Sequence, residues 1–281
     1  MDMNIAIIGL GLIGGSYAKA TKSRTLHTVY GYDLDQEVMM FARMTGAMDK
    51  ALTDELLETC DLVLVALRPG AALKWTEDHA TMLGKAKCTL VDICGVKRAV
   101  VGKMADIAQA NGFKYIGGHP MAGKEQGGFV NASDALFDGA SMILTPDANT
   151  DLPTLEMLKN YFTDIGFAHL TFTNPDEHDR IIAYTSQLAH IVSGAYVKSP
   201  TAQKRRGFSA GSFRDLTRVA RLDENMWTEL MLDNREYLAD ELRILIDNLQ
   251  PYLEALEQND ADKLRECLKE GRIAKASAGG N

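Results

Sequence analysis

Short apolar runs alternate with longer, mixed segments along the first half of the chain. Runs of this kind that end in glycine, proline or acidic residues are typical of strands buried on both faces of a sheet. The expected strands are residues 4–8, 28–32, 61–67, 88–93 and 114–117, with 141–144 and 169–172 as further candidates. They are separated by segments of helical length, such as 36–45, 71–82, 98–111 and 151–164. This alternation predicts a doubly wound, mostly parallel sheet of the α/β class.

The pattern changes at residues 174–176, after which apolar residues recur at helical spacing, most clearly over 230–249 and 253–268. No run in this part predicts a strand. We therefore divide the chain into a sheet-containing domain of residues 1–173 and an all-helical domain of residues 174–281. Because a long apolar helix in a small domain often packs on a copy of itself, we expect the helical domain to form a homodimer.

A glycine-rich turn links the first expected strand to the helix that follows it. Gly9, Gly11 and Gly14 fit the GxGxxG pattern, and Asp33 ends the second strand nineteen residues after Gly14. In this pattern the first glycine allows a tight turn, the second lets the backbone approach a pyrophosphate, and the third lets the helix pack closely against the sheet. The pyrophosphate would lie at the N-terminus of the helix, where free N–H groups favour an anion. The motif therefore predicts a Rossmann-type dinucleotide site.

The acidic residue at position 33 bears on which dinucleotide binds. A carboxylate there accepts hydrogen bonds from both ribose hydroxyls and repels a 2′-phosphate, so we expect NAD rather than NADP. The alternative is that Asp33 only caps the helix expected at 36–45. The cofactor-binding residues that we expect are Gly9, Gly11, Leu12, Ile13, Gly14, Asp33, Leu67 and Arg68.

A second motif, GHPMAGKE at residues 118–125, is the candidate for the chemical step. His119 follows the strand expected at 114–117, at the edge of the sheet where ligands bind in such folds. With an ordinary pKa of about 6.5, a histidine accepts a proton at neutral pH and is the commonest general base. Next to a nicotinamide it would take the proton of an alcohol as the hydride leaves. The alternative is a structural histidine.

Other polar residues each have two interpretations. Lys97, in the loop after the fourth expected strand, either binds an anionic substrate or caps a helix. Cys94, in the same loop, is either a small buried side chain or a reactive thiol. Arg218 either binds a carboxylate through its guanidinium fork or forms a surface ion pair with Asp215 or Asp223.

Composition and charge exclude several classes of protein. The chain has 281 residues and a net charge of −8, and without a stripe of lysines and arginines this acidic balance argues against nucleic acid as the main partner. No apolar run approaches the ~20 residues that cross a bilayer, so we expect no membrane segment. The four cysteines lack the spacing of a metal site, so we expect reduced thiols, no metal and a cytoplasmic location.

Taken together, these segments resemble the prephenate dehydrogenase family, which includes arogenate and cyclohexadienyl dehydrogenases. The likeness covers almost the whole chain and is most specific in HPMAG at 119–123, FRDLTR at 213–218 and Met226-Trp227. It also includes the glycine motif with Asp33, the loop at 92–97, His178-Asp179 and SQLAH at 186–190.

The resemblance implies an NAD-dependent oxidoreductase of tyrosine biosynthesis, with a helical second domain that dimerises. In that family C4 of prephenate gives a hydride to NAD+, the ring carboxylate leaves as CO2, and 4-hydroxyphenylpyruvate forms. By motif, His119 would take the proton of the 4-hydroxyl, and His190 and Arg218 would hold the substrate. Trp227 would help to shape the pocket, although His190 and Trp227 taken alone are typical of a helical core. The other residues expected beside the substrate are Gly95, Lys97, Lys124 and Glu125.

The chain departs from the family at two of these positions. The family's loop usually has a serine, which helps to orient the catalytic histidine, where this chain has Gly95. Lys124 stands where a threonine or serine is common, and it adds a cation near the site. The sequence does not separate prephenate from arogenate as the substrate. A β-hydroxyacid-type dehydrogenase and a non-catalytic NAD-binding regulator stay open as alternative functions.

Overall fold

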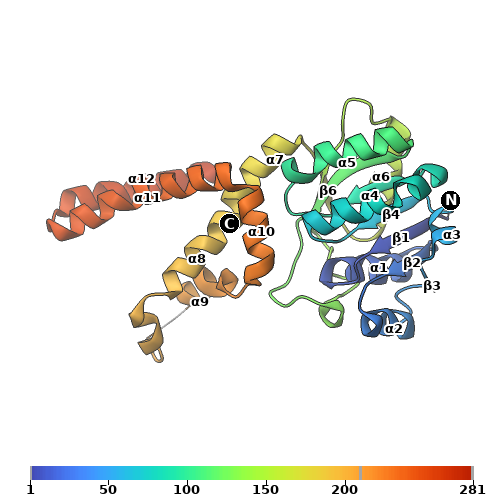
Figure 1. Cartoon of the computed structure of the whole chain (residues 1–281). Coiled ribbons are helices and arrows are strands. Elements are labelled where there is room, and N and C mark those ends of the chain that lie inside the picture. Colours follow the sequence, from blue (N-terminus) through green and yellow to red (C-terminus); the bar gives the residue numbers. More distant parts are fainter. Residues whose placement is uncertain (1, 209–210, 280–281) are drawn as a thin grey trace.

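Within the described residues, 2–208 and 211–279 of a computed structural model, one eight-stranded sheet forms the centre of the N-terminal part (Figure 1). The strands lie in the order β3-β2-β1-β4-β5-β6-β7-β8, and all neighbours are parallel except β6 and β7. This arrangement confirms the predicted doubly wound, mostly parallel sheet. The strands are β1 (Asn4–Ile8), β2 (Thr28–Tyr32), β3 (Lys50–Ala51), β4 (Leu62–Val65), β5 (Thr89–Asp92), β6 (Lys114–Pro120), β7 (Ser141–Thr145) and β8 (His169–Phe172).

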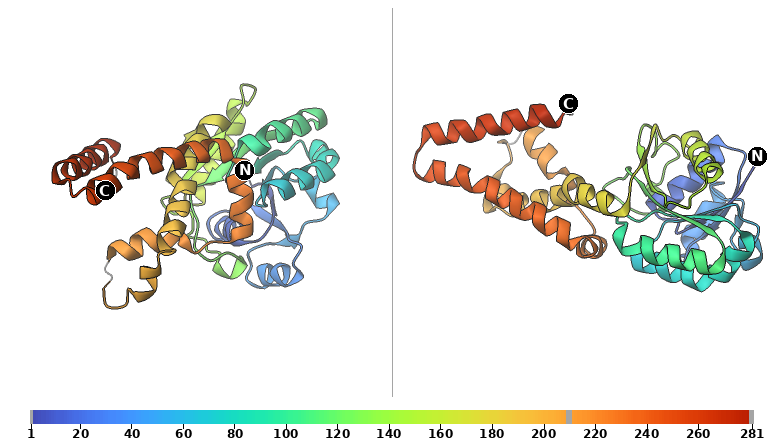
Figure 2. Two further views of the ribbon diagram at one scale, coloured as in Figure 1. Left: turned by 60° about the vertical axis from the view of Figure 1, so that its left-hand side comes forward. Right: turned by 90° about the horizontal axis from the view of Figure 1, so that it is seen from above.

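Helices cover both faces of this sheet (Figure 2). Successive residues of a strand point to opposite faces, so Ile5 and Ile7 pack into the core beneath α1, α2 and α6, whereas Ala6 and Ile8 pack beneath α4 and α5. These buried layers hold the carboxyl edge of the parallel strands in place. The helices of this part are α1 (Leu12–Arg24), α2 (Gln36–Met44), α3 (Asp54–Leu57), α4 (Pro69–Ala86), α5 (Arg98–Asn111) and α6 (Leu152–Asp164).

Strand β6 is longer than the apolar pattern predicts. It continues from residue 117 to Pro120 because it pairs there with the antiparallel β7, which places His119 opposite Ile143. His119 therefore lies on the strand itself, beyond the last residue of the parallel neighbour β5, since Asp92 pairs with Gly117. The structure thus places His119 at the carboxyl edge of the sheet, where the sequence predicts it.

The sheet gives way to helices between Phe172 and Pro175, where the side chain of Asn174 accepts a hydrogen bond from the N–H of Glu177 and caps α7. A π-helical segment, Ala183–Leu188, joins α7 to α8. No strand occurs among the described residues beyond β8. The helices are α7 (Pro175–Ile182), α8 (Ala189–Val197), α9 (Gly211–Thr217), α10 (Glu224–Asp233), α11 (Arg235–Glu257) and α12 (Ala261–Ala278).

The last two helices form a hairpin that projects away from the rest of the molecule (Figures 1 and 2). No helix in the part of the chain that the structure describes is long and apolar enough to span a membrane. The hairpin nevertheless carries large apolar side chains that are exposed in a single chain, namely Ile244, Ile246, Leu249, Leu253, Leu256, Leu268 and Ile273.

Candidate functional site

The glycine turn between β1 and α1 allows a ligand to approach the backbone closely. Gly9 has a φ of +87°, which favours glycine, and its N–H donates to the carbonyl of Tyr32 over 2.8 Å. A Cβ at Gly14 would lie 1.8 Å from the carbonyl oxygen of Gly9, so no larger residue fits. Beside Gly11, by contrast, no described neighbour lies within 4 Å of a Cβ position. The first turn of α1 has no side-chain cap, so its N–H groups are available to an anion.

Asp33 joins this glycine turn to the end of β2. Its carboxylate accepts hydrogen bonds from the N–H of Leu10 at 2.7 Å and of Asp35 at 2.9 Å. The cap of α2 is Asp35, whose carboxylate accepts from the N–H of Glu37, so the structure does not show Asp33 as the helix cap. A carboxylate has about four acceptor positions. Asp33 therefore keeps positions that can accept hydrogen bonds from a ribose.

Leu67 and Arg68 lie beside the glycine turn, just before α4. The Leu67 side chain would come within 2.8 Å of a Cβ built on the first glycine of the turn. The Arg68 guanidinium lies 3.4 Å from the carboxylate of Asp223, which caps α10. The N–H of Gly70 also donates to Glu229 of α10 over 3.1 Å. The edge of the sheet next to the glycine turn therefore contacts the helical part directly.

His119 is joined to the helical part by a chain of hydrogen bonds. Its Nδ1 lies 2.9 Å from Nε2 of His178, and Nδ1 of His178 lies 2.6 Å from Oδ1 of Asp179. The side chains of His178 and Asp179 have no exposed surface, whereas His119 is half-buried. Sequence reasoning gave His178 and Asp179 no role in the site. The available signal was an adjacent His-Asp pair in the first turns of the helix that Asn174 caps.

The order of donors and acceptors assigns the tautomers of both histidines. A carboxylate only accepts, so His178 donates from Nδ1 and its Nε2 accepts from Nδ1 of His119, which leaves Nε2 of His119 with a free lone pair. Burial lowers the pKa of His119 well below its ordinary value, and the neighbouring His178 and Lys97 lower it further. Burial also lowers the pKa of His178, although its hydrogen bond to Asp179 opposes that shift. Both rings are therefore neutral at neutral pH.

Lys97 stands at the N-cap position of α5, but its side chain makes no capping hydrogen bond there. The side chain has no exposed surface, and its Nζ donates to Oδ1 of Asp92 and to the carbonyl of Gly118, each over 2.5 Å. Asp92 ends β5 and is fully buried, so it requires a buried cation. The same carboxylate accepts from the hydroxyl of Tyr115 at 2.7 Å and the N–H of Cys94 at 3.0 Å. Lys97 thus holds the peptide that precedes His119.

The loop after β5 places a glycine, and so no side chain, beside the free nitrogen of His119. A Cβ built on Gly95 would lie 3.7 Å from Nε2 of His119 and 3.7 Å from the Leu230 side chain of α10. Burial raises the pKa of the neighbouring Cys94 thiol well above its ordinary value, and its Sγ lies 3.6 Å from the carbonyl of Leu67. Cys94 therefore fits the interpretation of a small buried side chain.

Lys124 and Glu125 are exposed on the loop that follows β6. The Nζ of Lys124 donates to the carbonyl of Asn131 over 2.8 Å, and Nζ of Lys19, from α1, donates to the carbonyl of Ala132 over 2.8 Å. Among the described residues no hydrogen bond or ion pair joins Lys124 or Glu125 to His119. The structure thus places both residues on the loop of the site without bringing them against the histidine.

Three predicted substrate residues come from the helical part. The rings of His190 and Trp227 lie 3.8 Å apart between centroids, and Nδ1 of His190 donates to the carbonyl of Ser186 over 2.9 Å, which leaves its Nε2 free to accept. Arg218 is exposed and begins a 3-10 turn, Arg218–Ala220, that packs against α8. It makes no ion pair within residues 2–208 and 211–279, since Asp223 pairs with Arg68. The guanidinium is therefore available to an anion.

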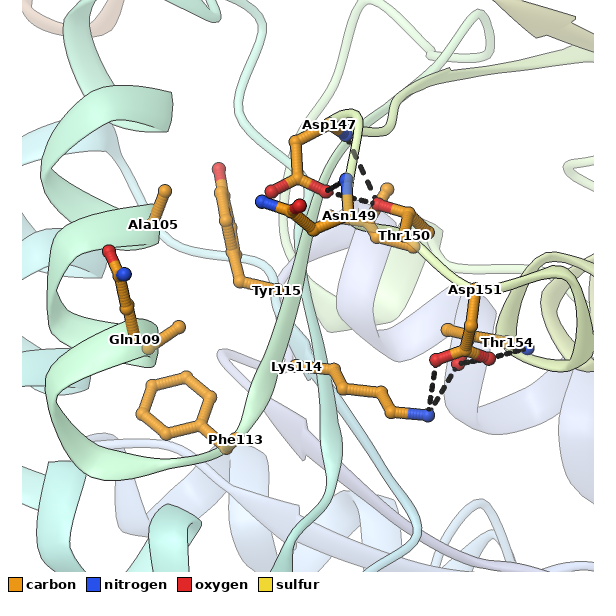
Figure 3. A pocket seen from close by; sticks show the side chains of 12 residues that line it. Ala105, Gln109, Phe113, Lys114, Tyr115, Asp147, Asn149, Thr150, Asp151 and Thr154 are labelled. Atoms are coloured by element: carbon orange, nitrogen blue, oxygen red, sulfur yellow. Dashed lines mark hydrogen bonds and ion pairs between the residues drawn. The ribbon is translucent and has the colours of Figure 1, made fainter.

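A cavity of about 250 Å³ lies elsewhere, between α5, the first residues of β6 and the loop before α6 (Figure 3). Its lining includes Phe113 and Tyr115, and Lys114 at its rim pairs with Asp151 at 2.7 Å. Lys114 and Tyr115 lie at the amino end of β6, whereas His119 lies near the carboxyl end. The cavity is therefore separate from the site around His119.

Comparison with known proteins assigns the two parts of the chain to one family. Residues 17–170 match the nucleotide-binding domain of prephenate dehydrogenase, and residues 174–270 match its dimerization domain. The chain is 34% identical over 283 residues to a cyclohexadienyl dehydrogenase of Zymomonas mobilis, covering 97% of this chain and 94% of that protein. It is 30% identical over 277 residues to a prephenate dehydrogenase of Bacillus subtilis, covering 96% of this chain and 74% of that protein.

A solved structure extends the likeness to three dimensions. The prephenate dehydrogenase of Aquifex aeolicus, in complex with hydroxyphenyl propionate and NAD+, superimposes with a TM-score of 0.83 at 28% identity, covering 99% of each chain. The two matched domains and these relatives agree with the order of sheet and helices described above. The chain therefore belongs to the prephenate dehydrogenase family of oxidoreductases.

Proposed function

We propose that the protein is an NAD-dependent prephenate dehydrogenase, which converts prephenate to 4-hydroxyphenylpyruvate, CO2 and NADH. The observation that carries this proposal is the free Nε2 lone pair of His119, located where the carboxyl edge of the sheet meets the helical part. Support also comes from the Aquifex relative, whose structure contains NAD+ and hydroxyphenyl propionate. A neutral histidine at this position is suited to act as a general base on a hydroxyl.

The glycine turn fits a dinucleotide. The uncapped first turn of α1 and the open space beside Gly11 suit a pyrophosphate, and the carboxylate of Asp33 suits the adenosine ribose. NAD+, when bound, would accept a hydride from C4 of the substrate. The Leu67 side chain lies beside Gly9 of this turn and Arg68 is the next residue, so we propose that both contact the cofactor too.

The residues around His119 account for the remaining chemistry. Nε2 of His119 takes the proton of the 4-hydroxyl as the C4–H bond breaks, and it returns this proton to the oxygen once loss of CO2 has made the ring aromatic. The Arg218 guanidinium would bind a substrate carboxylate through paired hydrogen bonds. His190, held against Trp227, would accept a hydrogen bond at its free Nε2.

A steady-state assay tests the proposed function. The purified protein would be supplied with prephenate or arogenate, each with NAD+ or NADP+, and the formation of reduced cofactor and CO2 would be followed. We expect turnover with prephenate and NAD+ and release of one CO2 per reduced cofactor. Turnover with arogenate alone would reassign the substrate, reduced cofactor without CO2 would favour a β-hydroxyacid-type reaction, and no turnover would favour a regulatory protein.

Replacing Asp33 with alanine should weaken NAD binding and relax discrimination against NADP. Loss of hydrogen bonds to a charged acceptor is expected to raise the Kd for NAD+ by about 10- to 100-fold, and loss of the charge removes the repulsion of a 2′-phosphate. Titration of the two cofactors by calorimetry measures both effects. Asp33→Asn is the matched control, since it keeps an acceptor for the N–H of Leu10. Unchanged affinities in both variants would exclude the ribose contact.

Replacing Arg218 with alanine should raise the KM for prephenate by about 10- to 100-fold, with kcat within about threefold of the wild-type value. The reason is that a contact to a carboxylate away from the reacting carbon is made equally in the ground state and the transition state. Arg243→Ala, on the exposed side of α11, is the control for loss of a surface guanidinium. A KM equal to that of the wild type would assign Arg218 to the surface alone.

The protein should form a homodimer through its helical part. The match to a dimerization domain and the exposed apolar side chains of the α11–α12 hairpin support this. Sedimentation should give about twice the mass of one chain, which is 30.8 kDa. Leu253→Glu places a charge on that apolar surface and should shift the mass toward a single chain, and a purely monomeric wild type would contradict the proposal.

A further inference from the structure

We infer that His178 and Asp179 are positioning residues, which orient the ring of His119 and keep its reacting nitrogen unprotonated. The inference rests on the proposed function, in which His119 is the base. It concerns Nδ1 of His119, the ring nitrogen that does not take the proton of the substrate. Among the described residues, the only hydrogen-bond partner of the His119 side chain is His178.

The first step is that Asp179 cannot turn away from His178. Its Oδ1 accepts from the N–H of Lys97 at 2.8 Å as well as from His178, and its Oδ2 accepts from the N–H of Arg98 at 2.9 Å. Both N–H groups belong to the start of α5, on the sheet-containing part. The carbonyl of Asp179 in turn accepts from Nδ2 of Asn234 at 2.8 Å. The carboxylate is therefore fixed from two parts of the molecule.

The second step is that this fixed carboxylate determines which ring nitrogen of His178, and then of His119, carries the proton. Because Asp179 only accepts, His178 must donate from Nδ1 and accept at Nε2, and His119 must then donate from Nδ1. With both rings neutral, any other arrangement places two donors or two lone pairs face to face. Nε2 of His119 is left as an acceptor, which is the state a general base needs.

The third step is that Asp179 offsets part of the cost of placing a positive charge on the buried ring of His119. The positive charge of the ring would then be shared by a hydrogen bond to a neutral imidazole backed by a buried carboxylate. The charged or titratable groups around His178 are Asp179, Lys97, Asp92 and His119. Of these, Lys97 and Asp92 already pair with each other, so Asp179 is the carboxylate that can compensate the imidazolium.

The fourth step concerns the opposite side of the ring. A side chain at position 95 would approach Nε2, since a Cβ there lies 3.7 Å from that nitrogen. Gly95 supplies no such side chain, and a serine there is the group to which the family resemblance gives the orienting role. In this chain the ring is held from Nδ1 instead, and no side chain from position 95 contacts the reacting nitrogen.

The experiment compares three variants that alter this chain of hydrogen bonds differently. His178→Leu removes the acceptor, and we expect kcat to fall by about 10²–10³-fold. His178→Gln keeps an acceptor oxygen for Nδ1 of His119, and we expect kcat within about tenfold of the wild type. Asp179→Asn removes the negative charge and one of the two acceptor oxygens, so the tautomers of both rings are no longer fixed, and we expect a loss at least as large as that of His178→Leu. His169→Leu, an exposed histidine on β8, is the control and should leave kcat unchanged.

A spectroscopic measurement separates this inference from the proposed function. Long-range ¹H–¹⁵N spectra report which ring nitrogen of a histidine carries the proton, with or without a substrate. The wild type should show Nδ1–H for both His119 and His178, and folded Asp179→Asn should show an increased share of Nε2–H at His119. If the wild-type protein shows no turnover, the proposed function is refuted, and the spectrum still tests the tautomers assigned to His119 and His178. Nε2–H at His119 in the wild type, or a folded His178→Leu with kcat within threefold of the wild type, would overturn the inference.

Discussion

Replacing His119 with asparagine is expected to lower kcat by about 10²–10⁴-fold, the usual contribution of a general base, while the Kd for NAD+ stays within about twofold of the wild-type value. The amide cannot take the proton of the substrate hydroxyl, but it is smaller than the imidazole and leaves the glycine turn untouched. Stopped-flow measurement of NADH formation gives the rate of the chemical step, and calorimetry gives the cofactor affinity. Turnover close to that of the wild type would remove His119 from the mechanism.

The pH dependence of the wild type provides a second test of the same residue. Burial lowers the pKa of His119 well below the ordinary value of about 6.5, so the base stays unprotonated in mildly acidic solution. Activity is present above the pKa of the folded protein and is lost as the pH falls through it. The acid limb of kcat/KM should therefore lie below pH 6.5 and should disappear from the residual activity of His119→Asn. An acid limb at or above pH 6.5 would mean that the ring is not desolvated as the structure indicates.

Local sequence pattern predicts the central strands and the nucleotide turn because both depend on neighbouring residues. The strands β1 and β4 are apolar runs buried on both faces. The turn needs glycine at position 14, because a Cβ there would collide with the backbone of Gly9. Strand β3, Lys50–Ala51, was not predicted because its two residues are exposed and carry no apolar signal. The extension of β6 to Pro120 was missed because it depends on pairing with β7, which no local pattern records.

The sequence predicts the chemistry of single residues in the candidate site, but not the contacts between them. The chemistry of His119 follows from its residue type and its place after a strand, but its partner His178 lies 59 residues further along, on a helix of the other part. No spacing in the sequence relates them. For Lys97 the residue type misled, since a lysine next to a loop is usually exposed. The partner of Lys97 is the buried carboxylate of Asp92, and its burial depends on the pairing of β5 with β6 in the folded sheet.

Replacing Lys97 with methionine is expected to destabilise the protein by about 3–5 kcal/mol, the usual cost of removing one partner of a buried ion pair. Both side chains of the pair with Asp92 have no exposed surface. Methionine fills most of the volume of lysine but leaves the Asp92 carboxylate and the carbonyl of Gly118 without their donor. Urea denaturation followed by fluorescence measures the loss as a lower midpoint with an unchanged slope. Lys74→Met, in an exposed pair with Asp78, should leave the midpoint where it is.

The double variant Lys97→Met with Asp92→Asn separates the charge from the packing. If the unpaired carboxylate causes the loss, neutralising it should restore part of the stability, because the amide oxygen can still accept from the N–H of Cys94 while the amide NH2 donates to the hydroxyl of Tyr115. We expect a lowered kcat in both the single and the double variant, since the Gly118 carbonyl lacks in each the ammonium that holds the peptide before His119. A single variant as stable as the wild type, combined with a raised KM, would instead return Lys97 to the role of a substrate ligand.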